Sequence, residues 1–291
     1  MNITPENYHS IEVKREWLSH SQYRRWLECG AAMKAELDGK YTPPMTEALM
    51  VGQYVDRAVT VPTEFDAWCK AHEGEIASAK TGKKYAAFAK ADALIARVQG
   101  DELYWAVVEG CKAQVVLQGE IGKVPWLYMA DFLREDAKTA TLLDFKTAKG
   151  FGDEWTIEEV NMGSEYRTVR TRVPWYDAAG YWRQLSVGRF LFHQQHSVFP
   201  LCGILAASKP PPDDFLGKPR PCGLGAWYLP EGELRFDREI SQIKNRLTDI
   251  MAWKRGDVPA PACGECDWCR SQSNWGKQQR GKSGRTWTVD E

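Results

Sequence analysis

Residues 141–147 read TLLDFKT, an apolar run that ends in two charged side chains, Asp144 and Lys146. Side chains two positions apart on a β-strand point to the same face, so these two are expected to point together. Asp131 ends a preceding apolar segment and is expected beside them on the neighbouring strand. Carboxylates that converge repel each other unless a cation lies between them, and hard oxygen ligands suit Mg²⁺ or Mn²⁺. The stretch therefore predicts a divalent-metal site with a lysine at its edge, where it can orient water or stabilise charge on a phosphate.

The surrounding segments favour this interpretation over an ordinary solvated strand end. Residues 113–121, 126–133 and 140–146 are rich in Val, Leu, Ile and aromatic residues, which predicts three successive antiparallel strands. Further strands are predicted at 202–207 and 225–229. Helices are predicted at 16–37, 46–61, 85–98 and 175–192 and from Asp237 to Gly256, and loops at 150–172 and 209–221. This order predicts an α/β core with an N-terminal helical region wrapped on it.

The composition is that of an ordinary globular protein. The 291 residues are 43% hydrophobic and 26% charged, which excludes wholesale disorder. A net charge of −1 excludes a generally basic protein, although a local basic groove is compatible with it. No stretch approaches the roughly 18 apolar residues of a membrane helix, and the N-terminus has no signal-peptide run, so a cytoplasmic protein is expected. Because the cytosol keeps thiols reduced, clustered cysteines predict metal ligation rather than disulfides.

The D-F-K-T segment, together with the upstream Asp131, resembles the PD-(D/E)XK nuclease superfamily, in particular its RecE-like and RecB-like exonucleases. The resemblance covers about residues 17–270. It implies a restriction-endonuclease-like core, in which helices flank a central mixed sheet. It also implies that Asp131, Asp144 and the carbonyl of Phe145 bind a catalytic Mg²⁺ or Mn²⁺ ion, and that Lys146 is the catalytic lysine.

The same resemblance implies an activity and partners. The chain is expected to be a metal-dependent DNA exonuclease that acts on linear duplex or single-stranded ends, in phage-type recombination or DNA end processing, beside a single-strand annealing protein. Related exonucleases include ring-shaped assemblies, so a homo-oligomer is left open. The alternative is a catalytically impaired DNA-binding module that keeps the fold and the metal cluster. A cluster-bearing redox protein would leave the carboxylates and the lysine without a role.

Two departures from the family pattern favour that alternative. The segment GQYVD ends at Asp56, where the family often carries a metal-binding His. Asp is a competent ligand for a hard cation, so Asp56 is a candidate metal ligand, and pairing with Arg57 is the alternative. The family also has a Q-x-x-x-Y signature, where this chain has Asp177 and Tyr181. Tyr181 and the nearby Gln184 are candidate DNA contacts, and a core role for Tyr181 is the alternative.

Three cysteines, Cys263, Cys266 and Cys269, are separated by two successive two-residue gaps. A zinc site usually needs a second C-x-x-C pair, whereas a C-x₂-C-x₂-C run is typical of [4Fe–4S] ligation. The segment around Cys29 resembles that of the superfamily's iron–sulfur nucleases, AddB and certain CRISPR-associated exonucleases, which implies Cys29 as the fourth ligand. A structural [4Fe–4S] cluster without a redox role is therefore predicted, with zinc as the alternative.

Basic residues follow the D-x-K strand. Arg167, Arg170 and Arg172 are candidates for a DNA-backbone clamp, with Tyr166 and Trp175 as flanking stacking surfaces. A solvated loop is the alternative interpretation of this segment.

The expected organisation has three parts. Residues 1–104 form an N-terminal helical region that carries Cys29 and Asp56, residues 105–258 form the nuclease core, and residues 259–291 carry the cysteine cluster and a basic tail.

Overall fold

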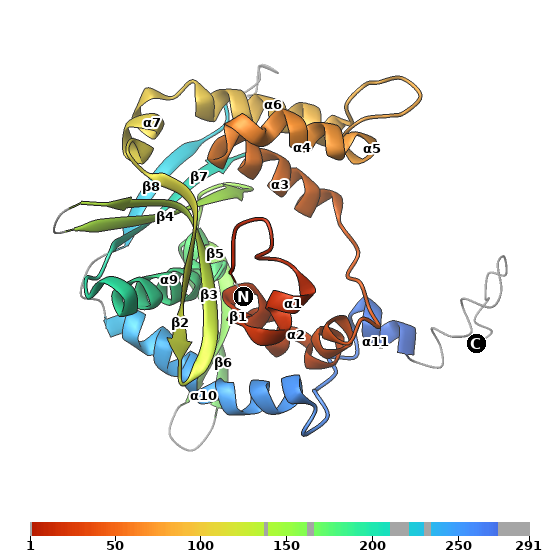
Figure 1. Cartoon of the computed structure of the whole chain (residues 1–291), viewed down its shortest axis with the longest axis vertical. Coiled ribbons are helices and arrows are strands. Elements are labelled where there is room, and N and C mark those ends of the chain that lie inside the picture. Colours follow the sequence, from red (N-terminus) through yellow and green to blue (C-terminus); the bar gives the residue numbers. More distant parts are fainter. Residues whose placement is uncertain (1, 137–138, 162–165, 210–220, 230–233, 273–291) are drawn as a thin grey trace.

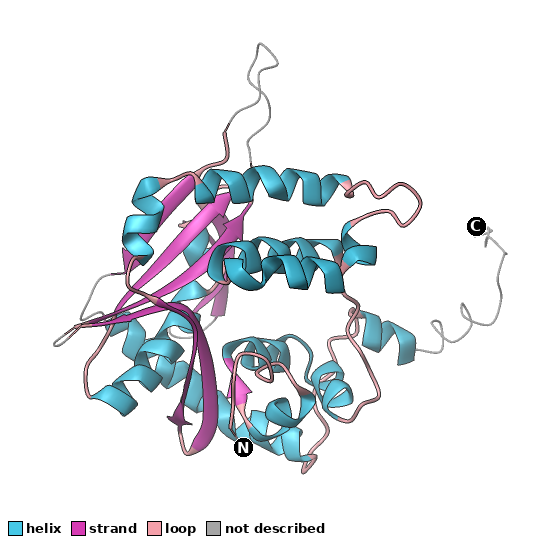
Figure 2. Ribbon diagram, turned by 45° about the horizontal axis from the view of Figure 1, so that its top comes forward, coloured by secondary structure: helices cyan, strands magenta, loops and turns pink. Residues whose placement is uncertain are grey.

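The computed structural model describes residues 2–136, 139–161, 166–209, 221–229 and 234–272, with the backbone alone for 156–161 and 166–169. Its centre is a six-stranded mixed sheet with helices packed on both sides (Figures 1 and 2). The strands are β1 (Leu18–Ser19), β2 (Lys112–Ile121), β3 (Val124–Glu135), β4 (Ala140–Ala148), β7 (Leu201–Ser208) and β8 (Leu224–Leu229). This architecture confirms the predicted fold class.

The three predicted central strands form an antiparallel meander. β2 pairs with β3 from Lys112 opposite Leu133 to Ile121 opposite Val124. β3 pairs with β4 over a shorter stretch, which ends at Phe132 opposite Leu143. β4 then pairs in parallel with β7, and β7 pairs in an antiparallel fashion with β8, which gives the sheet its mixed character.

β3 changes its neighbour along one edge, and this change opens the sheet. β3 pairs with β4 only from Phe132 to Glu135. Nearer its N-terminus, at Trp126 and Leu127, β3 pairs in parallel with β1 instead. Asp131 immediately precedes the part of β3 that pairs with β4, so it lies at the fork between the two strands.

Helices cover both faces because the central strands are apolar on both sides, as expected for strands buried between layers. Leu142 and Ile204 belong to the core that includes residues of α2 (His20–Leu37), α9 (Tyr181–His196) and α10 (Leu234–Arg255). Their neighbours Leu143 and Leu205 belong to the core with α3 (Glu47–Thr60), α6 (Ala86–Gln99) and α7 (Glu102–Val108). Alternate side chains of one strand thus anchor different helical layers.

Local signals account for several helix ends. Ser19 caps α2 by accepting a hydrogen bond from the backbone N–H of Gln22, and Thr46 caps α3 in the same way at Leu49. The predicted helix over 175–192 is divided into α8 (Trp175–Ala178) and α9, because Gly180 has a φ of +73°. The prediction that Asp237 caps α10 is wrong, since the helix already includes Leu234 and Asp237 lies in its first turn.

The remaining described helices are short. They are α1 (Ile11–Glu16), the 3₁₀ turn η1 (Pro62–Glu64), α4 (Phe65–Ala71), α5 (Glu73–Ile76) and α11 (Asp267–Gln272). None of the described helices is both long enough and apolar enough to cross a membrane. The predicted basic tail and most of the predicted loop 209–221 lie outside the described residues.

Residues 150–172 contain a hairpin, so the prediction of an irregular loop is wrong. β5 (Glu154–Asn161) and β6 (Tyr166–Val173) pair in an antiparallel fashion and form a sheet of their own. Their sequences mix Thr, Val and aromatic residues, which favour strands, with Glu and Arg. Because charged residues interrupt the apolar ones, the segment lacks the alternation of apolar and polar residues that identifies a half-buried strand.

Gly188→Ala is expected to destabilise the protein by about 1–3 kcal/mol through overpacking. Gly188 lies in α9, and a Cβ built there would lie 2.7 Å from Cε1 of the buried Tyr128. Gly52→Ala in α3 is the matched control, because nothing lies within 4 Å of its Cβ and helix propensity should add about 0.5–1 kcal/mol. Thermal unfolding should move the two Tm values in opposite directions. A raised Tm for Gly188→Ala would contradict the close packing of α9 on β3.

Candidate active site and four-cysteine centre

The two strand carboxylates meet at the fork between β3 and β4. Asp144 is 1% exposed and lies between Leu143 and Phe145, whose side chains pack on the α3 side of the sheet. The backbone N–H of Phe145 donates a hydrogen bond of 2.7 Å to Oδ2 of Asp131. This bond ties the Asp131 side chain to β4 at the point where the two strands separate.

Lys146 lies between these carboxylates. Its Nζ forms an ion pair with Asp144 and lies 4.0 Å from Oδ2 of Asp131. Burial disfavours the charged form, but the Asp144 and Asp131 carboxylates outweigh it and raise the pKa of Lys146 above its usual value. The Tyr181 ring supports the ammonium from the α9 side, with 5.3 Å between Nζ and the ring centroid.

α9 supplies a second contact to the acidic site. Nε2 of Gln184 donates a hydrogen bond of 3.1 Å to Oδ1 of Asp144, and Gln184 follows Tyr181 by one helical turn. Asp177, at the family's glutamine position, pairs instead with Arg235, whose Nη1 lies 2.8 Å from its Oδ2. The chain therefore brings an amide to Asp144 on β4 from a position seven residues after Asp177.

Asp56 approaches the same charges from α3. Burial raises the pKa of Asp56 to about 6; the charge of Asp144 adds to this shift, and Lys146 opposes it. Burial likewise raises the pKa of Asp131, with Asp144 and Asp56 adding to the shift and Lys146 opposing it. Three carboxylates thus act on one another around a single lysine, an excess of negative charge that a bound cation would relieve.

The charges of this site also act on two further side chains, Tyr8 and His20, which no sequence motif marked. Burial raises the pKa of Tyr8, hydrogen bonds with the Met129 backbone and Ser19 oppose the shift, and the charges of Asp131 and Asp144 add to it. Burial lowers the pKa of His20 to about 3, helped by neighbouring cations that include Lys146. His20 is therefore neutral at physiological pH and adds no positive charge beside the lysine.

The donor set suits a hard cation held by few protein ligands. Among the described side chains, three or more potential metal ligands lie close to one another only in the four-cysteine group described below. The carboxylates of the acidic site are instead arranged around Lys146. Mg²⁺ is usually held by one or two carboxylates and keeps several waters. Asp131 and Asp144, with the Phe145 carbonyl between Asp144 and Lys146 on the same strand, fit that requirement.

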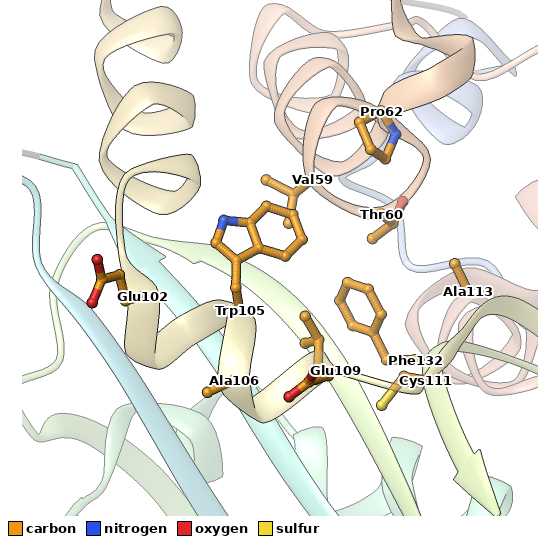
Figure 3. A pocket seen from close by; sticks show the side chains of 11 residues that line it. Val59, Thr60, Pro62, Glu102, Trp105, Ala106, Glu109, Cys111, Ala113 and Phe132 are labelled. Carbon is orange, nitrogen blue, oxygen red and sulfur yellow. The ribbon is translucent and has the colours of Figure 1, made fainter.

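A cavity of about 580 Å³ lies elsewhere, between the end of α3, α7 and β3. Figure 3 shows Val59, Trp105 and Phe132 directed toward this space, with Glu109 at its border. None of the acidic-site residues Asp56, Asp131, Asp144 or Lys146 lines it. The cavity is therefore separate from the acidic site.

The structure brings together the four cysteines from opposite ends of the chain. Sγ of Cys29 lies 3.6 Å from that of Cys269 and 3.7 Å from that of Cys266, and Cys263 lies 4.0 Å from Cys269. All four sulphur atoms lie within 4.8 Å of one another. All eight cysteines of the chain are in the described part and are free, so no disulfide accounts for this group.

The backbone around these sulphurs is shaped for close approach. Cys29 departs from helical geometry within α2, with φ −160° and ψ 92°. A Cβ on Gly30 would lie 2.9 Å from Cδ of Pro261, and the Ala31 N–H donates to the Pro261 carbonyl over 2.9 Å. α11 and α2 consequently lie side by side, as Figure 1 shows.

The spacing of the sulphurs tests which metal fits. Zn–S bonds of about 2.3 Å in a tetrahedron place neighbouring sulphurs about 3.8 Å apart. Three of the six sulphur pairs, at 3.6, 3.7 and 4.0 Å, are close to this value, and all six lie within 4.8 Å. The thiolates of a [4Fe–4S] cluster bind different irons and must stand further apart. The backbone N–H groups of Cys266 and Glu265 lower the pKa of Cys263 to about 6, which favours the thiolate that either metal requires.

The proposed DNA-binding arginines lie on the hairpin. The guanidinium of Arg170 lies 4.8 Å from the centroid of the Trp155 ring, and Arg172 faces Asp153 at 3.6 Å. The side chain of Arg167 lies outside the described residues. Trp175 is 4% exposed and packs in the core, so the suggested stacking role for it is wrong. Among the described side chains of the hairpin, Trp155 is the exposed aromatic one, and it lies in the segment that was predicted to be a loop.

Comparisons with known proteins agree with the fold. A family model described as a PDDEXK-like domain of unknown function matches residues 19–272. The crystal structure of a protein from Eubacterium rectale named "Putative exonuclease" has a TM-score of 0.75 at 22% identity, and the match covers 94% of each chain. The structure of SSO0001 has a TM-score of 0.32 at 10% identity, and the match covers 86% of this chain and 92% of that one. This similarity is too low to indicate a shared fold. None of the curated proteins is a significant match. Because the family model spans most of the chain and the fold agrees with it, the protein belongs to the PDDEXK-like domain family and has a nuclease fold.

Proposed function

We propose that the protein is a metal-dependent DNA exonuclease. The observation that carries this proposal is the convergence of Asp131, Asp144 and Lys146 at the fork between β3 and β4 of a PDDEXK-like domain. Asp144 itself is buried, whereas Asp131 and Lys146 keep 13% and 19% of their side chains exposed, so a phosphate group can approach the site from their side. Hydrolysis of a phosphodiester needs an activated water and compensation for the charge that develops on the phosphate.

Asp131, Asp144 and the Phe145 carbonyl are the proposed ligands of Mg²⁺ or Mn²⁺, with Asp56 as a further acidic ligand from α3. The ion supplies Lewis-acid stabilisation of the phosphate and lowers the pKa of bound water. Gln184 holds one oxygen of Asp144 and so fixes the direction of the carboxylate. Asp131 is fixed in the same manner by the backbone N–H of Phe145.

Lys146 is proposed as the catalytic lysine. Because its pKa is raised by the two carboxylates, it is an ammonium in this state and holds its proton. An ammonium here can orient a water and neutralise charge on the phosphate, while Tyr181 keeps it directed at the site. Arg167, Arg170, Arg172, Tyr181 and Gln184 are the proposed DNA contacts.

The four cysteines are proposed to hold a structural metal centre. The sulphur separations support one tetrahedral zinc ion, and the family resemblance supports a [4Fe–4S] cluster. Either centre would join α2, which packs against the sheet, to the C-terminal segment. Its role would be to position these elements, without a part in hydrolysis.

The proposed biological setting is phage-type recombination or DNA end processing. In that setting a single-strand annealing protein binds the strand that the exonuclease leaves. A catalytically impaired DNA-binding module is the second candidate, and the Asp56 and Asp177 departures favour it. Gln184 weakens that case, because it supplies to Asp144 an amide contact from α9.

End-labelled linear DNA is expected to be degraded by the purified protein with Mg²⁺ or Mn²⁺, and closed circular DNA of the same sequence is expected to survive. The position of the label that is released first gives the polarity. EDTA should stop the reaction, because the carboxylates alone cannot stabilise the phosphate. Binding of linear DNA without any cleavage, with either metal, would favour the non-catalytic module.

A further inference from the structure

The β5–β6 hairpin begins next to the acidic site. β4 ends at Ala148, and β5 starts six residues later at Glu154. The charge of Glu154 acts on Tyr181, the residue whose ring supports Lys146. β5 also contacts α8 (Trp175–Ala178), which ends three residues before Tyr181, so the base of the hairpin lies near the start of α9.

Trp155 stands out on this hairpin because its side chain is 60% exposed. Single exposed apolar side chains are common on folded proteins, so the exposure of Trp155 gains its meaning from the groups that lie beside it. Trp155 is the cross-strand partner of Arg172, and the Arg170 guanidinium lies over its ring. One aromatic surface is thus combined with two guanidinium groups, of which Arg172 also forms an exposed ion pair with Asp153 that a phosphate would have to replace.

This combination has the chemistry of a site for unpaired nucleotides. Aromatic side chains stack on exposed bases of any sequence, and arginines pair with the phosphates on either side. The bases of a duplex are covered by their neighbours, so an indole ring cannot stack on them along the helix. A peptide would use both features only if it placed carboxylates beside an apolar or aromatic side chain, whereas every nucleotide of an unpaired strand offers a base and a phosphate.

We propose that Trp155, Arg170 and Arg172 form a binding site for single-stranded DNA, in which the indole stacks on one unpaired base and the guanidinium groups contact the adjacent phosphates. This inference rests on the proposed nuclease function and assigns its substrate class. Because β5 contacts α8, which leads into α9 and Tyr181, a strand held on the hairpin can run toward Lys146. The site then receives an unpaired strand, either from a single-stranded substrate or from a frayed end.

The test is a binding titration without added Mg²⁺ or Mn²⁺, which prevents cleavage and leaves the metal of the four cysteines in place. A fluorescently labelled single-stranded oligonucleotide and a blunt duplex of the same sequence are titrated with wild-type protein, Trp155→Ala and Trp155→Phe. Loss of one base stack should weaken single-strand binding about ten-fold in Trp155→Ala. Trp155→Phe should restore most of the affinity, and duplex binding should change less than about two-fold.

Tyr228→Ala is the matched control, since Tyr228 is an exposed aromatic residue on β8, with 45% exposure. It should leave both affinities unchanged. An abasic position moved along the oligonucleotide locates the stacked base. Removing that base should weaken wild-type binding about as much as Trp155→Ala does, and should add no further loss in that variant.

Arg170→Gln keeps the proposal testable if Trp155→Ala does not fold, and should weaken single-strand binding with a reduced salt dependence. Equal losses for single strands and duplex in Trp155→Ala, or no loss for either, would overturn the inference. These results are separate from the nuclease assay. A wild-type protein that degrades linear DNA while Trp155→Ala binds normally refutes only this site. Selective loss of single-strand binding in a protein that never cleaves DNA refutes only the proposed activity.

Discussion

Asp144→Asn is expected to reduce cleavage of linear DNA at least about a thousand-fold. The substitution keeps the shape of the side chain and its neighbour Gln184, but it removes the charge that pairs with Lys146. A neutral amide is a poor ligand for a divalent cation and cannot offset the charge of the ammonium. The fold should persist, because Asp144 also contributes repulsion that raises the pKa of Asp131, and this repulsion disappears with the charge.

Binding measurements distinguish loss of the metal site from loss of the lysine. Titration with Mn²⁺ should show weakened binding for Asp144→Asn, whereas Lys146→Ala should still bind the ion and lose most of the rate. Asp92→Asn is the matched control, since Asp92 pairs with Lys84 on the protein surface, 2.8 Å away. It should cleave as the wild type does. A folded Asp144→Asn protein with the wild-type rate would show that the acidic site is not catalytic.

The acidic site was predictable from the sequence where it depends on strands with strong local signals. The apolar run before Asp144 and the i, i+2 spacing to Lys146 are local properties of one strand. The position of Asp131 followed from the predicted antiparallel meander, because the ends of β3 determine which of its residues lie opposite those of β2 and β4. The contact between Gln184 and Asp144 could be suspected from helical spacing, but its geometry depends on how α9 packs on the sheet.

Other features depend on tertiary contacts that leave little trace in the sequence. β1 has two residues, and it is a strand because β3 is free of β4 at that level of the sheet. The β5–β6 hairpin carries charges on strands that do not join the central sheet, so no apolar alternation marked it. Its exposed Trp155 was missed for the same reason, since a segment predicted to be a loop gave no register in which Trp155 and Arg172 are partners.

The cysteine centre combines both cases. The short gaps between Cys263, Cys266 and Cys269 are a local signal, whereas Cys29 lies 237 residues before Cys266. The prediction that Cys29 lies close to the other three cysteines came from the resemblance to a family, because residue spacing cannot predict a contact between segments so far apart in sequence. The separations between the sulphurs, which bear on the identity of the metal, are a property of the folded backbone around Gly30 and Pro261.

Cys29→Ser is expected to lose the metal and lower the Tm by about 10 °C. The described C-terminal segment after Val258 has no buried residue, so few apolar contacts hold it. Apart from the thiolates, α2 holds it through the Ala31–Pro261 hydrogen bond, and Tyr41 contacts Trp268 at 5.6 Å between ring centroids. A link between residues so distant in sequence removes about 4–5 kcal/mol of chain entropy from the unfolded state. Without it, the segment should detach while the sheet and its helices persist.

Metal analysis and limited proteolysis test this expectation together. Anaerobically purified wild-type protein should contain about one zinc per chain and no visible chromophore, in agreement with the sulphur separations. Cys29→Ser should contain none, and protease should cut it within residues 259–272, which the metal protects in the wild type. Cys69→Ser is the matched control, because Cys69 is half-buried and outside the group. About four irons per chain with brown colour would instead establish the iron–sulfur cluster. Wild-type Tm and protease resistance in Cys29→Ser would show that these thiolates hold no structural metal.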